Sequence, residues 1–220
     1  MLRLLFEKKG NAVWISHLDL MRLFQRAFKR ANLLLKHTQG YNPRPSVSIA
    51  LPLSVGVESC CELLDFEIEN QEPFSFDTIK QLLNENLVDG VTVLSVYDTG
   101  RKYRDLAYLQ CSIELFYDNG IPAGCQEAIK ELFSRNEIIL PKKTKNGIQD
   151  QDIIPMIKTL DVERVGEQQL AINCIICCQN PTLNPAQITL AITKYCPAFE
   201  PNFSKYRRVE IFDHDREVFR

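Results

Sequence analysis

The stretch SHLDLMRLFQRAFKRA, residues 16–31, predicts the first helix of the fold. Ser16 and Asp19 have the spacing of a capping box, in which the Ser16 side chain accepts a hydrogen bond from the amide of Asp19, so the helix should begin directly after Ser16. Steps of about 100° per residue place an apolar set on one side of this helix: Leu20, Phe24, Ala27, Phe28 and Ala31. We therefore expect that side to pack on a sheet.

Strand patterns lie on both sides of this helix. Residues 2–9 predict a strand before it, and residues 46–53 and 61–69 predict two strands after it. A second helix is expected at 75–86 and a further strand at 91–98. This order, strand–helix–strand–strand–helix–strand, is that of a ferredoxin-like (βαββαβ) unit with an antiparallel sheet.

The same order begins again after residues 99–105. Strands are expected at 106–118, 137–143, 157–165, 169–179 and 205–213, and helices at 122–136 and 184–195. The longest loop is expected at the lysine-rich residues 141–152. The predicted fold class is α+β, with tandem ferredoxin-like units at residues 1–100 and 106–220.

The composition is that of a globular protein, with 220 residues, 45% of them hydrophobic and 25% charged. No apolar run approaches the roughly 20 residues that a helix needs to cross a bilayer. The opening residues, MLRLLFEKKG, do not fit a signal peptide. We therefore expect a cytoplasmic protein that does not contact membranes.

Eight cysteines are present, mostly within apolar, strand-like runs, and we expect them to be core thiols. The nearest pattern to a metal site is Cys174-x-x-Cys177, in the run LAINCIICCQ. On a strand, an odd separation directs two side chains to opposite faces. A second cysteine pair and the C-x3-C-x2-C spacing of a radical-SAM cluster are also missing from the sequence. We expect neither a metal nor another cofactor.

The charge is unevenly distributed along the chain. Residues 20–57 contain six Lys or Arg and no acid, although the formal net charge is −2, so the rest of the chain carries about −8. Four basic residues of the first helix span an arc of only about 100° opposite its apolar side: Arg22, Arg26, Lys29 and Arg30. Ordinary solvated helix faces usually mix both signs. The pattern favours phosphate binding, and a solvated face is the alternative.

The loop GYNPRP, residues 40–45, continues the basic segment. Gly40 allows a sharp bend, and Pro43 and Pro45 hold the residues before them extended. An aromatic, an amide and a guanidinium on a stiff backbone suit stacking and hydrogen bonding to a nucleotide, although Tyr41 could instead pack in an ordinary turn. The nucleic-acid-binding residues that we expect are Arg22, Arg26, Lys29, Arg30, Lys36, Tyr41, Asn42 and Arg44.

The third predicted strand indicates which surface of the first unit is available. Its alternation directs one set of side chains to one face, Leu64, Phe66 and Ile68. It directs a second set to the other face: Leu63, Asp65, Glu67 and Glu69. We expect this second face to be open and acidic, and therefore to repel phosphate. The aromatic signature of an RNA-recognition motif is absent from the sequence.

Two histidines are candidates for catalysis. By helical stepping, His17 lies nearer the apolar side of the helix start, and we expect it to be tucked under that start rather than to act as a base. His37 is close to Tyr41 and Arg44 in the sequence but has no evident partner. The sequence contains no glycine-rich phosphate loop and no nucleophile elbow.

Three segments resemble the radical-SAM-linked proteins, bacterial domains of unassigned function that are fused to, or encoded beside, a radical-SAM protein. These segments are WISHLDLMRLFQRAFKRANLLL (14–35), GYNPRPSVSIALPLSVGVES (40–59) and ELLDFEIE (62–69). The residues that follow the family pattern are Ser16, His17, Leu18, Asp19, Arg22, Arg26, Arg30, Gly40, Pro43 and Pro45. Asn32 and Leu34 depart from it, where Gly and Pro would be expected, as does Tyr41, where Phe would be expected. The resemblance implies a radical-SAM protein as the partner.

The tandem ferredoxin-like order also resembles, at the level of fold, the repeat-associated RNA endonucleases of CRISPR systems. Those enzymes cut RNA without a metal, using a histidine near the first helix. Three functions follow. We favour a non-catalytic accessory module that binds tRNA or rRNA for a radical-SAM enzyme. The alternatives are a protein-docking subunit and a metal-independent endoribonuclease that uses His17 or His37.

Overall fold

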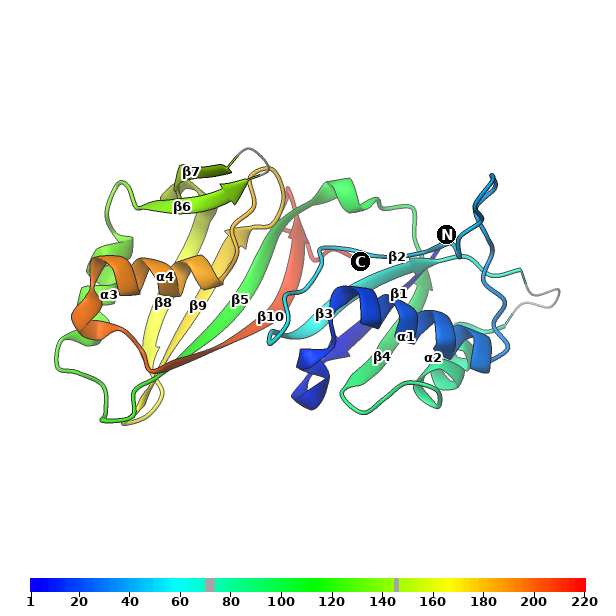
Figure 1. Ribbon diagram of the computed structural model, residues 1–220, viewed down its shortest axis with the longest axis horizontal. Helices are drawn as coiled ribbons and strands as arrows, with labels where there is room; N and C mark the ends of the chain where they lie inside the picture. Colours follow the sequence, from blue (N-terminus) through cyan, green and yellow to red (C-terminus); the bar gives the residue numbers. More distant parts are fainter. Residues whose placement is uncertain (70–73, 145–146) are drawn as a thin grey trace. The chain divides into compact units, whose positions relative to one another are not determined.

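The computed structural model describes residues 1–69, 74–144 and 147–220. The chain forms two compact units, Met1–Asp105 with Arg220, and Leu106–Phe219. Each unit contains an antiparallel sheet with two helices on one face, so the predicted α+β class with ferredoxin-like units is confirmed (Figure 1). No helix in the described part of the chain is long and apolar enough to cross a membrane.

The first unit has the predicted order of elements. They are β1 (Leu2–Lys8), α1 (His17–Arg30), β2 (Val47–Ile49), β3 (Glu58–Phe66), α2 (Phe76–Asn84) and β4 (Val91–Asp98). A short 3-10 helix, Gly10–Trp14, lies between β1 and α1. The strands pair antiparallel in the order β4-β1-β3-β2. The first and third strands are therefore central, as the split βαβ pattern requires.

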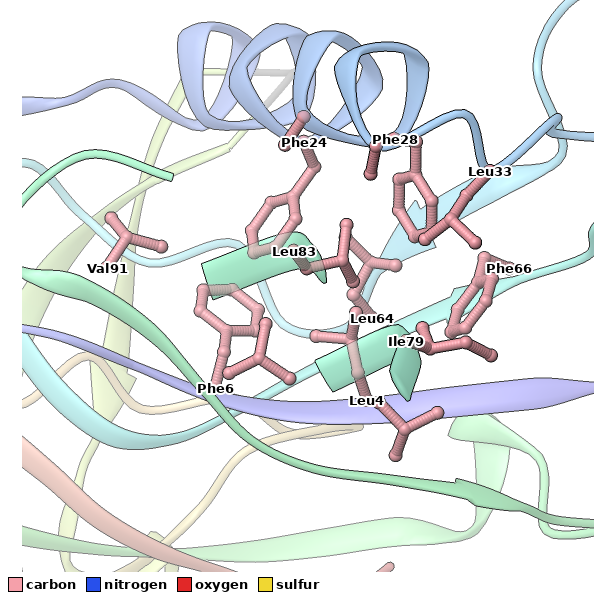
Figure 2. Close-up of a cluster of buried hydrophobic side chains, with 14 of the residues drawn as sticks. Leu4, Phe6, Phe24, Phe28, Leu33, Leu64, Phe66, Ile79, Leu83 and Val91 are labelled. Carbon is pink, nitrogen blue, oxygen red and sulfur yellow. The ribbon is translucent and has the colours of Figure 1, made fainter. Parts of the chain in front are cut away.

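The core of this unit lies between the two helices, α1 and α2, and the sheet (Figure 2). The five apolar residues predicted for the helix are all buried: Leu20, Phe24, Ala27, Phe28 and Ala31. Phe24 meets Phe6 of β1 edge-on, with ring centroids 4.8 Å apart, and Phe28 lies 4.9 Å from Phe66 of β3. Complete burial of one such side chain contributes about 1.5–3 kcal/mol. This packing fixes which side of α1 remains exposed.

Gly90, in the turn before β4, is a position where only glycine fits. Its φ is +86°, and a Cβ there would meet the carbonyl oxygen of Lys9 and approach the Cβ of Ala12 to 2.9 Å. The amide of Lys9 donates to the Gly90 carbonyl at 2.8 Å. Because the backbones approach so closely, a side chain at this position would push the turn away from the end of β1.

The structure first corrects the prediction that one face of β3 is open and acidic. Leu64 and Phe66 do lie in the core, but Asp65 on the other face is buried, where both of its carboxylate oxygens accept hydrogen bonds from Arg3 at 2.6 and 3.0 Å. The Tyr103 ring lies 4.8 Å from the Arg3 guanidinium, and its hydroxyl donates to the Leu63 carbonyl. The expectation of an open acidic face was wrong at Leu63 and Asp65, because an arginine from β1 neutralises Asp65 and residues 99–105 lie over this part of the face. Beyond the end of β3, Glu67 remains partly exposed and Glu69 exposed.

The second unit repeats the topology. Its sheet and the two helices that cover it are formed, in chain order, by β5 (Leu106–Phe116), α3 (Cys125–Phe133), β8 (Ile157–Arg164), β9 (Gln169–Cys177), α4 (Ala186–Tyr195) and β10 (Phe203–Asp213). The strands pair antiparallel in the order β10-β5-β9-β8. The order fourth, first, third, second is therefore the same as in the first unit.

The structure also corrects the prediction of a long loop at residues 141–152. An antiparallel hairpin of β6 (Ile139–Thr144) and β7 (Gly147–Asp152) occupies it, with residues 145–146 outside the described part. The Tyr195 hydroxyl of α4 donates to the Ile139 carbonyl at 2.9 Å, and Leu140 is fully buried. The strand expected at 137–143 overlaps β6, but β7 and its pairing with β6 were missed, because the cross-strand partners are largely polar, Lys142 opposite Gln149 for example, and show no apolar alternation.

Six of the eight cysteines are buried, as expected for core thiols: Cys61, Cys111, Cys125, Cys174, Cys177 and Cys178. Cys60 is exposed and Cys196 is partly buried. Burial raises the pKa of the Cys178 thiol to about 11, although the nearby Arg208 opposes the shift. Within the ranges that the structure describes, no group of three or more His, Cys, Asp or Glu could hold a metal ion.

Candidate nucleic-acid interface

The start of α1 is built around Ser16 and Asp19. The Ser16 hydroxyl accepts a hydrogen bond from the Asp19 amide at 3.2 Å and donates to the Asp19 carboxylate at 2.7 Å. The predicted cap is therefore present, and the Asp19 side chain turns back toward the Ser16 hydroxyl. Arg22 also donates to Asp19, at 3.0 Å. The hydrogen bonds from Ser16 and Arg22 lower the pKa of Asp19. The single acidic side chain of this helix is therefore already hydrogen-bonded to neighbouring side chains at the helix start.

The four basic residues of α1 all lie on its exposed side, as predicted: Arg22, Arg26, Lys29 and Arg30. Their surroundings differ. Arg22 is paired with Asp19, and the guanidinium of Arg30 donates to the backbone carbonyl of Asn86, just beyond α2. Arg26 and Lys29 have no ion pair among the described residues. We refer to these four residues as the basic stripe; Arg26 and Lys29 are its most available cations.

After α1, residues 36–46 double back to form a narrow arm (Figure 1). The Thr38 amide donates to the Arg44 carbonyl at 2.8 Å, and the Arg44 amide donates to the Thr38 hydroxyl at 3.0 Å. His37 pairs with Pro45 in an antiparallel bridge, and Gly40 has a φ of +135° between these two sides. Hydrogen bonds across the arm therefore add to the stiffness predicted from its prolines.

The predicted binding residues of the arm differ in their surroundings. Lys36 lies at its base, where its ammonium group is 3.4 Å from the Glu67 carboxylate, so part of its charge is already balanced. Tyr41, Asn42 and Arg44 are exposed, and the Tyr41 side chain is fully accessible to solvent. The alternative in which Tyr41 packs into the turn is therefore wrong. The arm presents an aromatic, an amide and a guanidinium to solvent.

The two histidines do not form one site. His17 is the first residue of α1 and is partly buried, whereas His37 is exposed in the arm beyond the other end of this helix. A helix of 14 residues is about 21 Å long. Neither imidazole has a hydrogen-bond partner within residues 1–69, 74–144 and 147–220. The structure thus brings neither histidine together with a second group suited to acid–base catalysis.

Trp14 is a feature that the sequence analysis did not use. It ends the 3-10 helix before α1, and its side chain is 70% exposed. Two further apolar side chains are also exposed, Leu18 in the first turn of α1 and Val55 in the loop before β3. The signal was available, because Trp14 is the single tryptophan of the chain and lies in the segment WISHL next to the basic stripe.

Comparison with known proteins places the chain in a family. Residues 1–185 match the family model described as uncharacterized protein conserved in bacteria, DUF2344. The chain belongs to this family. The DUF2344 match includes the whole basic stripe and the arm, and it extends through the second unit to the residue before α4. No curated protein matches the sequence.

Similarity to solved structures concerns the fold alone. A chain in the crystal structure of a Cbf5-Nop10-Gar1 complex is similar over 96% of this chain, with a TM-score of 0.53 and 9% identity. The match covers 48% of that chain, so this DUF2344 chain spans about half the length of the structure it resembles. An unknown protein from Galdieria sulphuraria matches with 11% identity over 94% of this chain and 97% of its own, but its TM-score of 0.27 carries no argument.

Proposed function

We propose that this chain is a non-catalytic accessory module of a radical-SAM enzyme system, and that it binds tRNA or rRNA through the basic stripe and the arm. The observation that carries the RNA part is the exposure of four cations on one side of α1, with no acid on the helix after Asp19. The arm supports it with an exposed aromatic, Tyr41, and an exposed guanidinium, Arg44. The radical-SAM part rests on the resemblance of residues 14–35, 40–59 and 62–69.

The physical basis is the release of counterions from RNA. Each phosphate that a protein cation neutralises contributes about −0.7 to −0.9 to the slope of log K against log salt. If Arg22, Arg26, Lys29 and Arg44 each contact one phosphate, the slope should be roughly −3 to −4. A protein of formal net charge −2 has no overall attraction for RNA, so binding of this kind requires a local cationic surface.

The test is fluorescence anisotropy of labelled tRNA over a series of salt concentrations. The double variant Arg26→Gln/Lys29→Gln removes the two most available cations of the basic stripe, and we expect the slope to weaken by roughly 1.4 to 1.8. The matched control, Lys130→Gln/Arg135→Gln, removes the same charge from exposed positions in and just after α3, and should leave the slope unchanged. Absent or salt-independent binding, or an equal effect in the control, would contradict the proposal.

The same samples test the endoribonuclease alternative. With His17 and His37 at opposite ends of α1, the geometry does not favour it. We expect RNA incubated with the protein in EDTA to remain intact on a denaturing gel. Cleavage that disappears in His17→Ala or His37→Ala would replace the binding proposal with a catalytic one.

The radical-SAM part needs a separate measurement. We expect the chain to co-purify with a radical-SAM protein when it is isolated from its own organism. If this association survives nuclease treatment and is lost in Arg26→Glu, the basic stripe is a protein-docking surface and the RNA proposal is wrong.

A further inference from the structure

Trp14 is held in place by a buried lysine. Lys8 of β1 is 1% exposed, and its ammonium group donates to the backbone carbonyls of Val13 at 3.2 Å and Ile15 at 2.8 Å. These two carbonyls lie on either side of Trp14 in the chain. Burial lowers the pKa of Lys8, and the nearby carboxylate of Glu62 opposes this shift. A buried cation is costly unless it is well hydrogen-bonded, and here its bonds fix the backbone that presents an exposed indole.

The loop before β3 lies against one edge of the Trp14 indole ring. The Gly56 amide donates to the Val13 carbonyl at 2.9 Å. A Cβ at Gly56 would lie 3.6 Å from Cζ3 and 4.0 Å from Cη2 of Trp14, so the edge of the ring rests close to the Gly56 backbone. The contact on one side is with backbone, and 70% of the side chain remains accessible to solvent. The ring is therefore positioned before any ligand arrives.

Leu18, four residues after Trp14 in the chain, begins a ridge of α1 that leads into the basic stripe. Leu18 is 66% exposed, and it precedes Arg22 and Arg26 at spacings of four and eight residues, so all three lie along one ridge of α1. The ridge thus passes from apolar to cationic along the helix. Beyond the other end of α1, the arm presents a second exposed aromatic ring, that of Tyr41, which is fully accessible to solvent. Exposed aromatic rings therefore flank the cations at both ends.

We infer that Trp14 is a stacking platform for an unpaired base of the RNA, whose phosphates lie along Arg22 and Arg26. This inference rests on the proposed function and specifies its ligand as RNA with a single-stranded segment. Aromatic side chains stack on bases of any sequence, whereas bases paired inside a duplex have no free face to offer. A preformed, exposed indole next to a row of cations has the two groups that this recognition requires.

The single tryptophan makes the inference directly measurable, because all indole emission from this chain comes from Trp14. The protein is titrated with an unlabelled single-stranded RNA 12-mer, with the blunt duplex of the same sequence, and with inorganic polyphosphate. We expect the single strand to quench the emission and the other two to leave it nearly unchanged. Equal quenching by polyphosphate would overturn the inference, since polyphosphate has no bases.

Variants provide the second readout. Replacing one stacking aromatic by alanine should weaken single-strand binding about 5- to 150-fold. We expect Trp14→Ala to lose affinity in this range, and Trp14→Phe to keep most of it. The matched control is Phe76→Ala, which removes an exposed aromatic from α2 and should change affinity less than twofold. The duplex should bind wild type and Trp14→Ala equally.

The outcomes separate this inference from the proposed function. If labelled RNA binds with the expected salt dependence but Trp14→Ala behaves like Phe76→Ala, stacking is refuted and the RNA-binding proposal stands. If no RNA binds, the proposed function fails, and the inference fails with it. If a purified acidic protein partner, and not RNA, quenches or shifts the emission, the Trp14 surface is a protein-docking site and base stacking is wrong.

Discussion

The buried ion pair between Arg3 and Asp65 should be one of the largest single contributors to the folded state of the first unit. The Arg3 side chain is completely buried, and it donates to both carboxylate oxygens of Asp65 and, at 2.8 Å, to the Arg101 carbonyl. Asp65→Ala would leave a guanidinium without its anion in the interior. Removing one partner of a buried pair typically costs about 3–5 kcal/mol. For a chain of this length, this loss corresponds to a decrease in Tm of roughly 6–20 °C.

A double variant that removes both partners identifies the source of the loss. The double variant Arg3→Met/Asp65→Leu replaces the pair by apolar groups, and replacements of this kind are often neutral or stabilising. We therefore expect it to be clearly more stable than Asp65→Ala. The control is Asp98→Ala, which removes an exposed pair with the N-terminal amine, 3.3 Å away, and should cost less than about 1 kcal/mol.

The assay is urea unfolding followed by circular dichroism, with thermal unfolding as a second measurement. Two results would refute the reasoning. One is an Asp65→Ala variant within about 1 kcal/mol of wild type, which would mean that solvent reaches Arg3. The other is a double variant as unstable as Asp65→Ala, which would mean that the packing of residues 99–105, and not the unpaired charge, determines the loss.

The remaining predictions concern the turn before β4 and the thiols. Gly90→Ala should destabilise the protein by at least about 1–2 kcal/mol, because φ is +86° and the new Cβ would meet the Lys9 carbonyl. The control is Gly100→Ala, where a Cβ would enter open space, and it should change the free energy of unfolding by less than about 0.5 kcal/mol. Equal effects of the two substitutions in urea unfolding would contradict this prediction. In native protein at pH 8, Ellman's reagent should react rapidly with the exposed Cys60, and Cys60→Ser should remove that fast phase. Cys178, directly after β9, is buried and should not react until the chain unfolds, because its pKa is raised to about 11 and little thiolate is present at pH 8. Fast labelling of Cys178 would show that the chain opens locally at this position.

Much of the fold was predictable, because both ferredoxin-like units are built from strongly periodic segments. The cap at Ser16, the buried side of α1 and the exposure of the four cations all follow from local spacing. A strand overlapping β6 was predicted, but β7 and its pairing with β6 were not predicted from hydrophobic periodicity. The signal that could have found it is the dipeptide Asn146-Gly147, which is typical of tight hairpin turns.

The candidate site was predictable in part. The exposure of Tyr41, Asn42 and Arg44 agrees with the sequence analysis, but Lys36 turned out to be paired with Glu67. The fixed position of Trp14 could not be predicted, since it depends on Lys8 from a strand and Gly56 from a loop more than forty residues away. Local pattern identifies an aromatic residue but does not show what holds it.

The sequence by itself determined the order of the elements, the amphipathic helix α1 and the basic stripe, because each depends on residues a few positions apart. The tertiary structure decided which charges remain available. Asp65 alternates to a face that looked acidic and open, but Arg3 pairs with it, and Tyr103, 38 residues further along the chain, stacks on that arginine. An ion pair across strands depends on register and chain folding in three dimensions, and neither can be recognised in the alternation of a single strand.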